Sequence, residues 1–245
     1  MTALLRRRTR TDVPDASVIR MVDVGMTYPN GKVALADVNV EIGRGDFVFL
    51  VGPSGAGKST FIRLLIREQV PTTGRVQVAG RDLEHMRRGQ VPALRRRIGI
   101  VFQDFRLLPN KTVWENVAFA LDVTGTPGTT VRRRVPQLLN LVGLHEHAHH
   151  LPTQLSGGEQ QRTAIARALV HDPAILIADE PTGNLDPVTS WELIQLLIQI
   201  NELGTTVLMA THNQEIVNAM RRRVLALEAG HLVRDEAAAA YEREY

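Results

Sequence analysis

The sequence of 245 residues contains no cysteine, which excludes disulfide bonds, cysteine–zinc sites and thiol catalysis. It also lacks long hydrophobic runs, because apolar stretches such as Ala174–Ala178 fall far short of the roughly 20 residues that a membrane-spanning helix needs. Residues 1–17 have no apolar core of the kind found in a signal peptide, since Arg6–Arg8 follow a very short apolar start. We therefore expect a cytoplasmic protein that reaches a membrane only through a partner.

The chain also has little excess charge: 29 Lys and Arg against 26 Asp and Glu give a formal net charge of +3. Residues 1–17 hold four arginines and two aspartates, so +2 of this excess lies in that leading segment. The remainder has no general basic surface that would attract nucleic acid, and we expect no nucleic-acid partner. With 44% hydrophobic and 22% charged residues, the composition is that of a globular protein.

Short apolar runs alternate with segments of helical period. Solid apolar runs, as expected of strands buried on both faces, are Phe47–Val51, Ile98–Phe102, Ile175–Ala178 and Val207–Ala210. Helical periodicity marks Thr60–Arg67, Val113–Leu121, Val131–Val142, Glu159–Val170 and Val188–Asn201. Val18–Val24 and Val38–Ile42 alternate instead, and Val224–Leu227 with Leu232–Arg234 resembles a hairpin. The pattern predicts an α/β fold with a largely parallel sheet, packed helices and a smaller antiparallel sheet.

One segment, Gly52–Ser59, fits the pattern G-x-x-x-x-G-K-[ST] at every fixed position. It lies between the buried strand Phe47–Val51 and a helical segment, which is the context of a phosphate-binding loop. The glycines let backbone amides surround a phosphate, and the helix N-terminus adds its partial positive charge. We expect Lys58 to reach the β- and γ-phosphates of a nucleotide and the Ser59 hydroxyl to ligate Mg²⁺.

Two adjacent carboxylates follow the strand Ile175–Ala178. Asp179 is placed to hold Mg²⁺ through water and to complete the site begun by Ser59. Glu180 is placed to act on the attacking water as a general base. Two acids after a strand are weak evidence alone. Because the same chain has a phosphate-binding loop, a metal-binding and catalytic role is the favoured interpretation of this pair.

The segment Leu155–Arg162 contains a capping box formed by Ser156 and Glu159, so its simplest interpretation is a helix start. However, Gly157 and Gly158 leave bare N–H groups at this helix N-terminus. The chain therefore has a second candidate anion site besides the phosphate loop.

This segment is similar to the signature motif of ABC-transporter ATPases. The order of phosphate loop, Gln103, signature, Asp179-Glu180 and His212 also resembles that family. The resemblance implies an ATPase that binds ATP and Mg²⁺ on a P-loop NTPase (RecA-like) core with a small antiparallel β subdomain and an inserted helical subdomain. It further implies an ATP-dependent, head-to-tail homodimer and an integral membrane partner that docks near Gln103.

The same resemblance implies domain boundaries. Residues 18–103 and 169–236 would form the two parts of the nucleotide-binding core, and 104–168 the helical subdomain with the signature motif. Residues 1–17 depart from the family pattern and would be a basic, disordered tail, and residues 237–245 would be a C-terminal tail. Within the helical part, Thr112 and Glu115 form a second capping box.

Individual roles also follow from the resemblance. Gln103 would contact Mg²⁺ and the attacking water, and His212 would hold the γ-phosphate and orient Glu180. Tyr28 would stack on adenine, although an ordinary tyrosine at a strand end is the alternative. Asp186 would lie in the loop that crosses to the partner subunit, and before a proline it is also typical of a helix N-cap.

The expected site is thus specified residue by residue. The expected catalytic residues are Glu180, His212, Gln103 and Lys58. The expected nucleotide-binding residues are Tyr28, Gly52, Pro53, Ser54, Gly55, Ala56, Gly57, Lys58, Ser59, Thr60, Ser156, Gly157, Gly158, Glu159 and Asp186. The expected metal ligands are Ser59, Gln103 and Asp179.

Within the family, Val91–Pro109 and Ala210–Asn213 resemble the ATPases of bacterial cell-division complexes, a likeness that extends over about residues 18–236. It implies an ATPase on the inner face of the cell membrane at the division septum, whose ATP cycle acts through its membrane partner on peptidoglycan hydrolases. The alternative is the ATPase of a lipoprotein-release or macrolide-type exporter, because those proteins share the block Asp179–Asp186. A soluble ABC protein that acts on ribosomes or DNA is disfavoured, because neither tandem cassettes nor a long coiled-coil insertion is present.

Four histidines cluster within residues 145–150, namely His145, His147, His149 and His150. They could bind a metal, but no carboxylate or cysteine framework accompanies them. We therefore expect them to form a solvated helix end.

Overall fold

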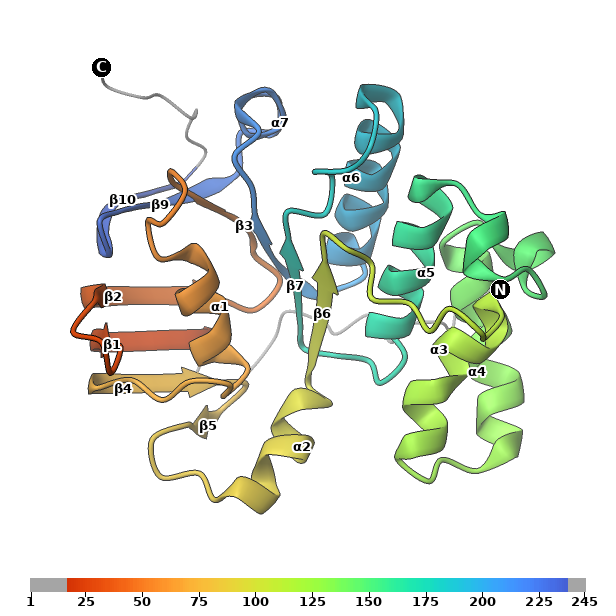
Figure 1. Ribbon diagram of the computed structural model, residues 1–245, viewed down its shortest axis with the longest axis horizontal. Helices are drawn as coiled ribbons and strands as arrows, with labels where there is room; N and C mark the ends of the chain where they lie inside the picture. The colour runs from red at the N-terminus through yellow and green to blue at the C-terminus, as the bar shows by residue number, and fades with distance from the viewer. Residues whose placement is uncertain (1–16, 238–245) are drawn as a thin grey trace.

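An antiparallel sheet and a mostly parallel sheet share one hydrophobic core in the computed structural model, which describes residues 17–237 (Figure 1). The antiparallel sheet has the order β2-β1-β4-β5 and the larger sheet the order β10-β9-β3-β8-β7-β6. The strands are β1 (Ser17–Thr27), β2 (Val33–Gly43), β3 (Phe47–Val51), β4 (Thr73–Val78), β5 (Arg81–Asp82), β6 (Ile98–Phe102), β7 (Ile175–Asp179), β8 (Thr206–Ala210), β9 (Arg223–Glu228) and β10 (His231–Glu236). The two predicted tails lie outside the described residues, apart from Ser17 and Ala237.

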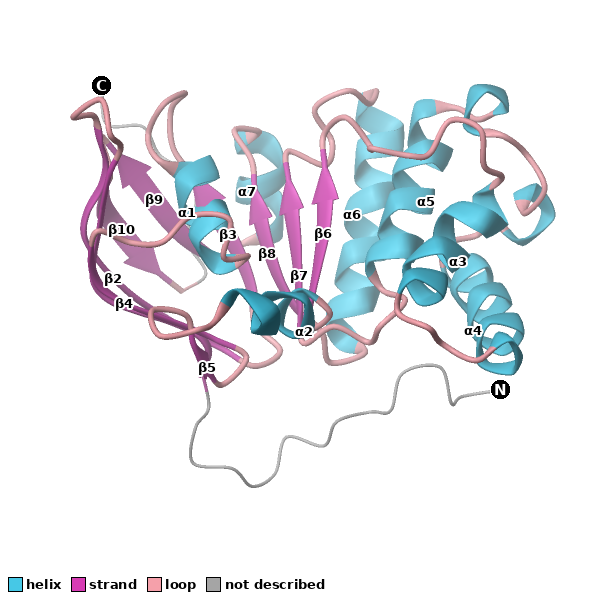
Figure 2. Ribbon diagram, turned by 60° about the horizontal axis from the view of Figure 1, so that its bottom comes forward, coloured by secondary structure: helices cyan, strands magenta, loops and turns pink. Residues whose placement is uncertain are grey.

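Five strands of the larger sheet are parallel, and only β10 at its edge is antiparallel. Figure 2 shows the arrowheads of β3, β8, β7 and β6 at the same edge of the sheet. In open α/β sheets, ligands bind outside the carboxyl ends of the strands. This edge is therefore where the chemistry of the chain is expected.

The central strand β3 explains why the buried strands are solid apolar runs. Phe47, Phe49 and Val51 belong to the hydrophobic cluster on one face of the sheet, which includes residues of α3–α6. Val48 and Leu50 belong to the cluster on the other face, between this sheet, α1 and the antiparallel sheet. The strand is covered on both sides, as its sequence predicts.

Seven α-helices accompany the sheets in the described part of the chain. They are α1 (Lys58–Leu65), α2 (Val91–Arg95), α3 (Val113–Val123), α4 (Gly128–Leu141), α5 (Gly157–Ala168), α6 (Pro187–Glu202) and α7 (Gln214–Met220). Between β6 and β7 the chain forms helices and turns only, and α3, α4 and α5 gather to one side of the sheets (Figure 1). The predicted capping box at the start of α3 is formed, because the Glu115 amide donates to Thr112 Oγ1 at 3.2 Å and the Thr112 amide to Glu115 Oε2 at 2.8 Å.

Four elements, β4, β5, α2 and α7, lie outside the ranges predicted from the sequence. In β4, only Val76 and Val78 are buried, so its apolar signal is weak. β5 has two residues, and α2 has five with Pro92 in its first turn. The first two strands are also longer than predicted, since each has 11 residues. None of the described helices is long and apolar enough to cross a membrane.

Candidate active site

The loop Gly52–Gly57 joins β3 to α1 and requires glycine at both of its ends. Gly52 has a φ of 147°, and a Cβ there would lie 2.2 Å from the carbonyl oxygen of Leu227. Gly57 has a φ of 113°, and a Cβ there would lie 2.7 Å from the carbonyl oxygen of Ala34. Any side chain would push the loop off the neighbouring strands, so its tight path depends on these two glycines.

Lys58 opens α1 and folds back over the loop. Its Nζ donates hydrogen bonds to the carbonyl oxygens of Gly52 at 2.6 Å and Pro53 at 3.2 Å. The N-cap of the helix is Gly57, which has no side chain to occupy the first amides of the helix. The ammonium group and these amides together form a site that suits the phosphates of a nucleotide.

Tyr28, just after β1, is held against the first turn of α1. Its Oη lies 3.1 Å from Oγ1 of Thr60, a buried residue, while the tyrosine itself is partly exposed. An aromatic ring thus stands beside the phosphate loop with part of its surface open to solvent. A residue that stacks on a nucleotide base needs this combination.

Asp179 ends β7, between β6 and β8. Burial raises the pKa of its carboxyl group and the neighbouring Glu180 raises it further, while the positive charge of Lys58 opposes the shift. A partly buried carboxylate beside another acid gains from a cation. Ser59, the second residue of α1, remains the second oxygen donor predicted for this site from the sequence. Among residues 17–237, no group of three or more His, Cys, Asp or Glu side chains could hold a metal ion. An aspartate carboxylate and a serine hydroxyl are oxygen donors of the kind that Mg²⁺ takes, because this ion uses one or two protein oxygens together with the phosphates of its substrate.

Glu180 and His212 contact each other at the ends of β7 and β8. His212 Nδ1 lies 2.9 Å from Glu180 Oε2. The backbone of Glu180 has a φ of 49°, and its amide donates to the carbonyl oxygen of Ala210 at 2.9 Å. The carboxylate is thereby fixed beside Asp179 and aimed at the histidine.

Gln103 follows β6 and forms two hydrogen bonds with Asn184. The Gln103 side-chain Nε2 donates to Asn184 Oδ1 at 3.2 Å, and Asn184 Nδ2 donates to the backbone carbonyl oxygen of Gln103 at 3.1 Å. The glutamine also packs on Gly183, where a Cβ would lie 2.8 Å from Nε2. The sequence analysis missed Asn184, whose signal was its place in the block Asp179–Asp186.

The signature segment begins α5 with the predicted capping box. The Ser156 amide donates to Glu159 Oε2 at 2.7 Å, and the Glu159 amide donates to Ser156 Oγ at 3.3 Å. Gly158 packs against α6, since a Cβ there would lie 2.4 Å from Thr189 Cγ2. Asp186 caps α6 by accepting from the Thr189 amide at 3.0 Å, so it is an N-cap as predicted and lies close to the signature helix.

Two further side chains of α5, which the sequence analysis did not select, join this helix to the strand ends. The buried Gln161 donates through Nε2 to the carbonyl oxygens of Pro181 at 2.8 Å and Phe102 at 3.3 Å. Arg167 donates to two successive carbonyl groups in the loop after Gln103, at 3.0 and 2.7 Å. The signature helix is thus fixed to the loop that carries Gln103.

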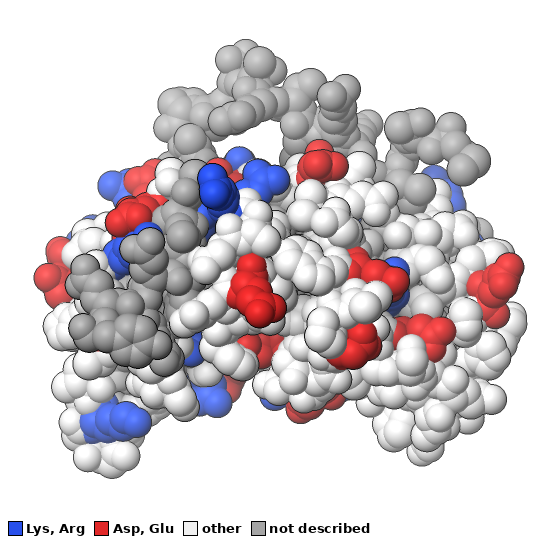
Figure 3. All heavy atoms as spheres, turned by 90° about the horizontal axis from the view of Figure 1, so that it is seen from above, with Lys and Arg blue, Asp and Glu red and all other residues white. Residues whose placement is uncertain are grey.

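The two candidate anion sites, at the starts of α1 and α5, belong to separate regions of the chain. Figures 1 and 2 both place α1 and α5 on opposite sides of β6 and β7. Figure 3 shows the face toward which β6 and β7 point in Figure 1, and its visible part carries side chains of both signs. The visible part of this face therefore forms no extended basic surface that would attract anions.

Comparison with known proteins agrees with this geometry. A family model described as "ABC transporter" matches residues 35–183. The chain belongs to the family of ABC transporter ATPases. It is 54% identical to the cell division ATP-binding protein FtsE of Bacillus subtilis over 224 residues, which are 91% of this chain and 98% of that protein. It is 56% identical to FtsE of Mycobacterium tuberculosis over 86% of this chain and 92% of that protein, and 45% identical to FtsE of Escherichia coli over 88% and 97%.

Solved structures of ABC ATPases have the same fold. A dimeric ATP-binding cassette, MJ0796 bound to ADP and Pi, has a TM-score of 0.79 and 37% identity, covering 91% of this chain and all (100%) of that chain. CbiO1 of Clostridium perfringens, part of the transporter complex cbiONQ, has a TM-score of 0.85 and 31% identity, covering 91% and 90%. The predicted fold class is therefore confirmed, and this ABC ATPase of the FtsE type hydrolyses ATP.

Proposed function

We propose that this ABC ATPase is the ATP-hydrolysing subunit of a membrane complex that acts in bacterial cell division. Its partner would be an integral membrane protein resembling FtsX, on the inner face of the membrane at the septum. The ATP cycle would move this partner and thereby control peptidoglycan hydrolases. The observation that carries the proposal is 45–56% identity to cell division proteins over nearly their whole length.

Hydrolysis would use the residues at the strand ends. Lys58 and the amides of Gly52–Ser59 would bind the phosphates, and Tyr28 would contact the adenine. Mg²⁺, held by Ser59, Asp179 and Gln103, would neutralise charge on the phosphates.

Glu180 would take the proton of the water that attacks the γ-phosphorus, with ADP as the leaving group. His212 would hold the Glu180 carboxylate in place through the 2.9 Å contact and would lie against the γ-phosphate.

The separation of α1 from α5 supports a dimer as the working unit. Each nucleotide would lie between Gly52–Ser59 of one subunit and the signature segment Ser156–Glu159 of the other, with Asp186 near the subunit boundary. ATP would close this head-to-tail homodimer through charge-assisted hydrogen bonds, and hydrolysis would remove them. The loop after Gln103 would carry the change to the membrane partner, since Arg167 joins it to the signature helix.

The test is capture of the partner in the closed state. Tagged full-length Glu180→Gln would be recovered from detergent-solubilised membranes of its own organism with ATP and Mg²⁺, and the co-purifying proteins identified. Lys58→Ala, which lacks the phosphate-binding ammonium group, is the matched control. A single small membrane protein with one sizeable outer domain, enriched only with Glu180→Gln, is the expected result. A larger permease with export machinery would replace this proposal by the exporter alternative, and ribosomal or DNA-bound proteins alone would contradict both.

A further inference from the structure

The histidine cluster of residues 145–150 divides into two exposed and two partly buried side chains. His145 and His149 are exposed, as predicted for a solvated helix end. His147 and His150 are partly buried, with ring centroids 5.1 Å apart and an interplanar angle of 50°. This second pair is therefore only partly solvated.

His147 contacts the signature motif. Its Nε2 lies 3.2 Å from Oε1 of Glu159, and the two side chains are 37% and 30% exposed. The other carboxylate oxygen, Oε2, accepts from both the amide and the hydroxyl of Ser156, each at 2.7 Å. A single carboxylate is thus shared between the signature serine and His147.

The environment of the ring places its proton on the nitrogen that faces Glu159. Nδ1 of His147 and Nδ1 of His150 are buried, and neither has a hydrogen-bond partner within the described part of the chain. A buried N–H without an acceptor is rarer and more costly than an unused lone pair, so the neutral ring carries its proton on Nε2. Hydrogen bonds from the Ser156 hydroxyl and amide lower the pKa of Glu159, so the acceptor is ionised at neutral pH.

We propose that His147 is a positioning residue for the signature motif: by holding Oε1 of Glu159, it fixes the carboxylate that orients Ser156 at the start of α5. The inference rests on the proposed binding of ATP between two subunits. To donate to a phosphate of the facing subunit's ATP, the Ser156 hydroxyl must turn away from Glu159. Glu159 then keeps the hydrogen bond from the side chain of His147. This bond continues to stabilise the negative charge of the carboxylate while an anionic phosphate approaches.

The test measures dimer formation in the full-length Glu180→Gln protein, with ATP and Mg²⁺ as the probe. His147→Ala removes the donor to Glu159, and His147→Gln replaces it with an amide N–H at a similar reach. His149→Ala is the control, because that histidine is exposed in the same segment. ATP binding, ATP-dependent dimerisation and the melting temperature are measured for each variant.

We expect His147→Ala to need about fivefold to tenfold more ATP than the parent for half-maximal dimerisation. The affinity of the single subunit for ATP should stay within about twofold of the parent's value. His147→Gln should recover most of the loss, and His149→Ala should match the parent. A purely structural role would lower the melting temperature without rescue by Gln. Dimerisation of His147→Ala at the parent's ATP concentration, or equal loss in both variants, would overturn this inference alone. Failure of the Glu180→Gln parent to dimerise would overturn the proposed dimer and this inference with it.

Discussion

His212 and Glu180 are joined by two contacts to the same oxygen atom. Oε2 of Glu180 lies 2.9 Å from the Nδ1 atom of His212 and accepts from its amide at 3.4 Å. The glutamate side chain is only 17% exposed and the histidine side chain 70%, so the histidine extends toward solvent from a carboxylate that is itself fixed. The relationship orients a candidate general base before any substrate arrives.

The first prediction concerns this pair. Glu180→Gln should bind ATP but lower kcat by about 100-fold or more, because an amide cannot accept the proton of water. His212→Ala should retain ATP binding and lower kcat by about tenfold or more, since the carboxylate loses its orienting contact. Phosphate release measures both effects, with Glu202→Gln as the control because this exposed acid lies at the far end of α6. Turnover of Glu180→Gln at the wild-type rate would remove Glu180 from the role of base.

The second prediction concerns Tyr28. Base–aromatic stacking is worth about 1–3 kcal/mol, so Tyr28→Ala should raise the Kd for ATP by about 5-fold to 160-fold. Tyr28→Phe keeps the ring and loses only the 3.1 Å contact with Thr60, so it should bind ATP nearly as well as the wild type. Equilibrium titration with ATP decides the question. Unchanged affinity in Tyr28→Ala would favour the alternative of an ordinary strand-end tyrosine.

The elements that sequence reasoning recovered are those whose signal is local. The five-residue strands β3 and β6 match the predicted ranges, because each is a solid apolar run of neighbouring residues. The capping boxes of α3 and α5 are likewise set by residues three positions apart. The phosphate loop could also be predicted from local sequence, because its pattern and its flanking strand and helix all lie within one short stretch.

What sequence reasoning missed depends on contacts between distant segments. Asn184 pairs with Gln103 across 81 positions of sequence, and its place in the block Asp179–Asp186 does not reveal this contact. Gln161 is buried only because β6 and β7 end beside α5. The partial burial of His147 follows in the same way from the packing of the helical region, which a cluster of polar residues does not reveal.

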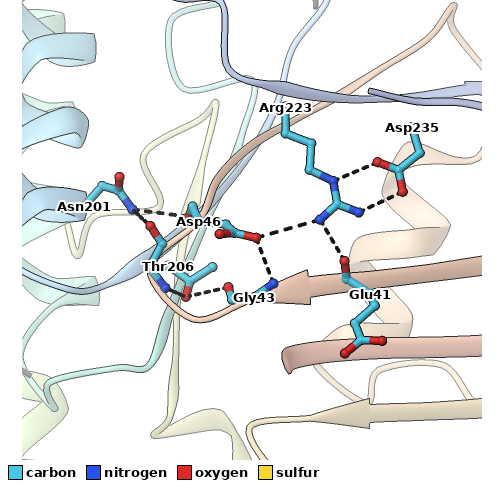
Figure 4. Close-up of polar contacts among 8 residues, drawn as sticks. Glu41, Gly43, Asp46, Asn201, Thr206, Arg223 and Asp235 are labelled. Carbon is cyan, nitrogen blue, oxygen red and sulfur yellow. Dashed lines mark hydrogen bonds and ion pairs between the residues drawn. The ribbon is translucent and has the colours of Figure 1, made fainter. Parts of the chain in front are cut away.

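The third prediction separates stability from activity. Arg223 lies opposite Val48, near the start of β3 and therefore away from its carboxyl end. Its guanidinium donates to both carboxylate oxygens of Asp235 at 2.7 Å and to the Glu41 carbonyl oxygen at 2.8 Å, and joins β9, β10 and β2 (Figure 4). We expect Arg223→Ala to lower the free energy of unfolding by about 1–3 kcal/mol, because a bidentate, partly buried ion pair is lost.

Urea unfolding and ATP titration check this prediction together. The exposed neighbour Arg222 provides the control, and Arg222→Ala should change the free energy of unfolding by less than about 0.5 kcal/mol. The Kd for ATP should stay at the wild-type value in both variants. An unfolding midpoint of Arg223→Ala equal to that of the wild type would show that the network adds nothing to stability.

The fourth prediction follows from the pKa of Asp179, which burial and then Glu180 raise above the value of an exposed aspartate. The folded protein therefore binds this proton more tightly than the unfolded chain does, and stability is lost as the pH rises through the folded-state pKa. At pH 7, Asp179→Asn removes that cost, so the melting temperature of the ligand-free protein should rise by about 1–3 °C. The difference should vanish at acid pH, where both states of the wild type are protonated.

With ATP and Mg²⁺ bound, the wild type should have a higher melting temperature than Asp179→Asn, the reverse of the order expected without ligand. The wild type gains stability from the bound nucleotide and metal, whereas Asp179→Asn gains less because it has lost an anionic ligand. Thermal unfolding with and without ATP and Mg²⁺ measures this reversal, and Asp122→Asn, which changes an exposed aspartate of α3, should show neither effect. If ligand-free Asp179→Asn melts at a lower temperature than the wild type, the claim that the buried Asp179 carboxylate destabilises the ligand-free protein is wrong. Full stabilisation of that variant by ATP and Mg²⁺ would remove Asp179 from the metal site, because loss of an anionic ligand must weaken the binding that stabilises the folded state.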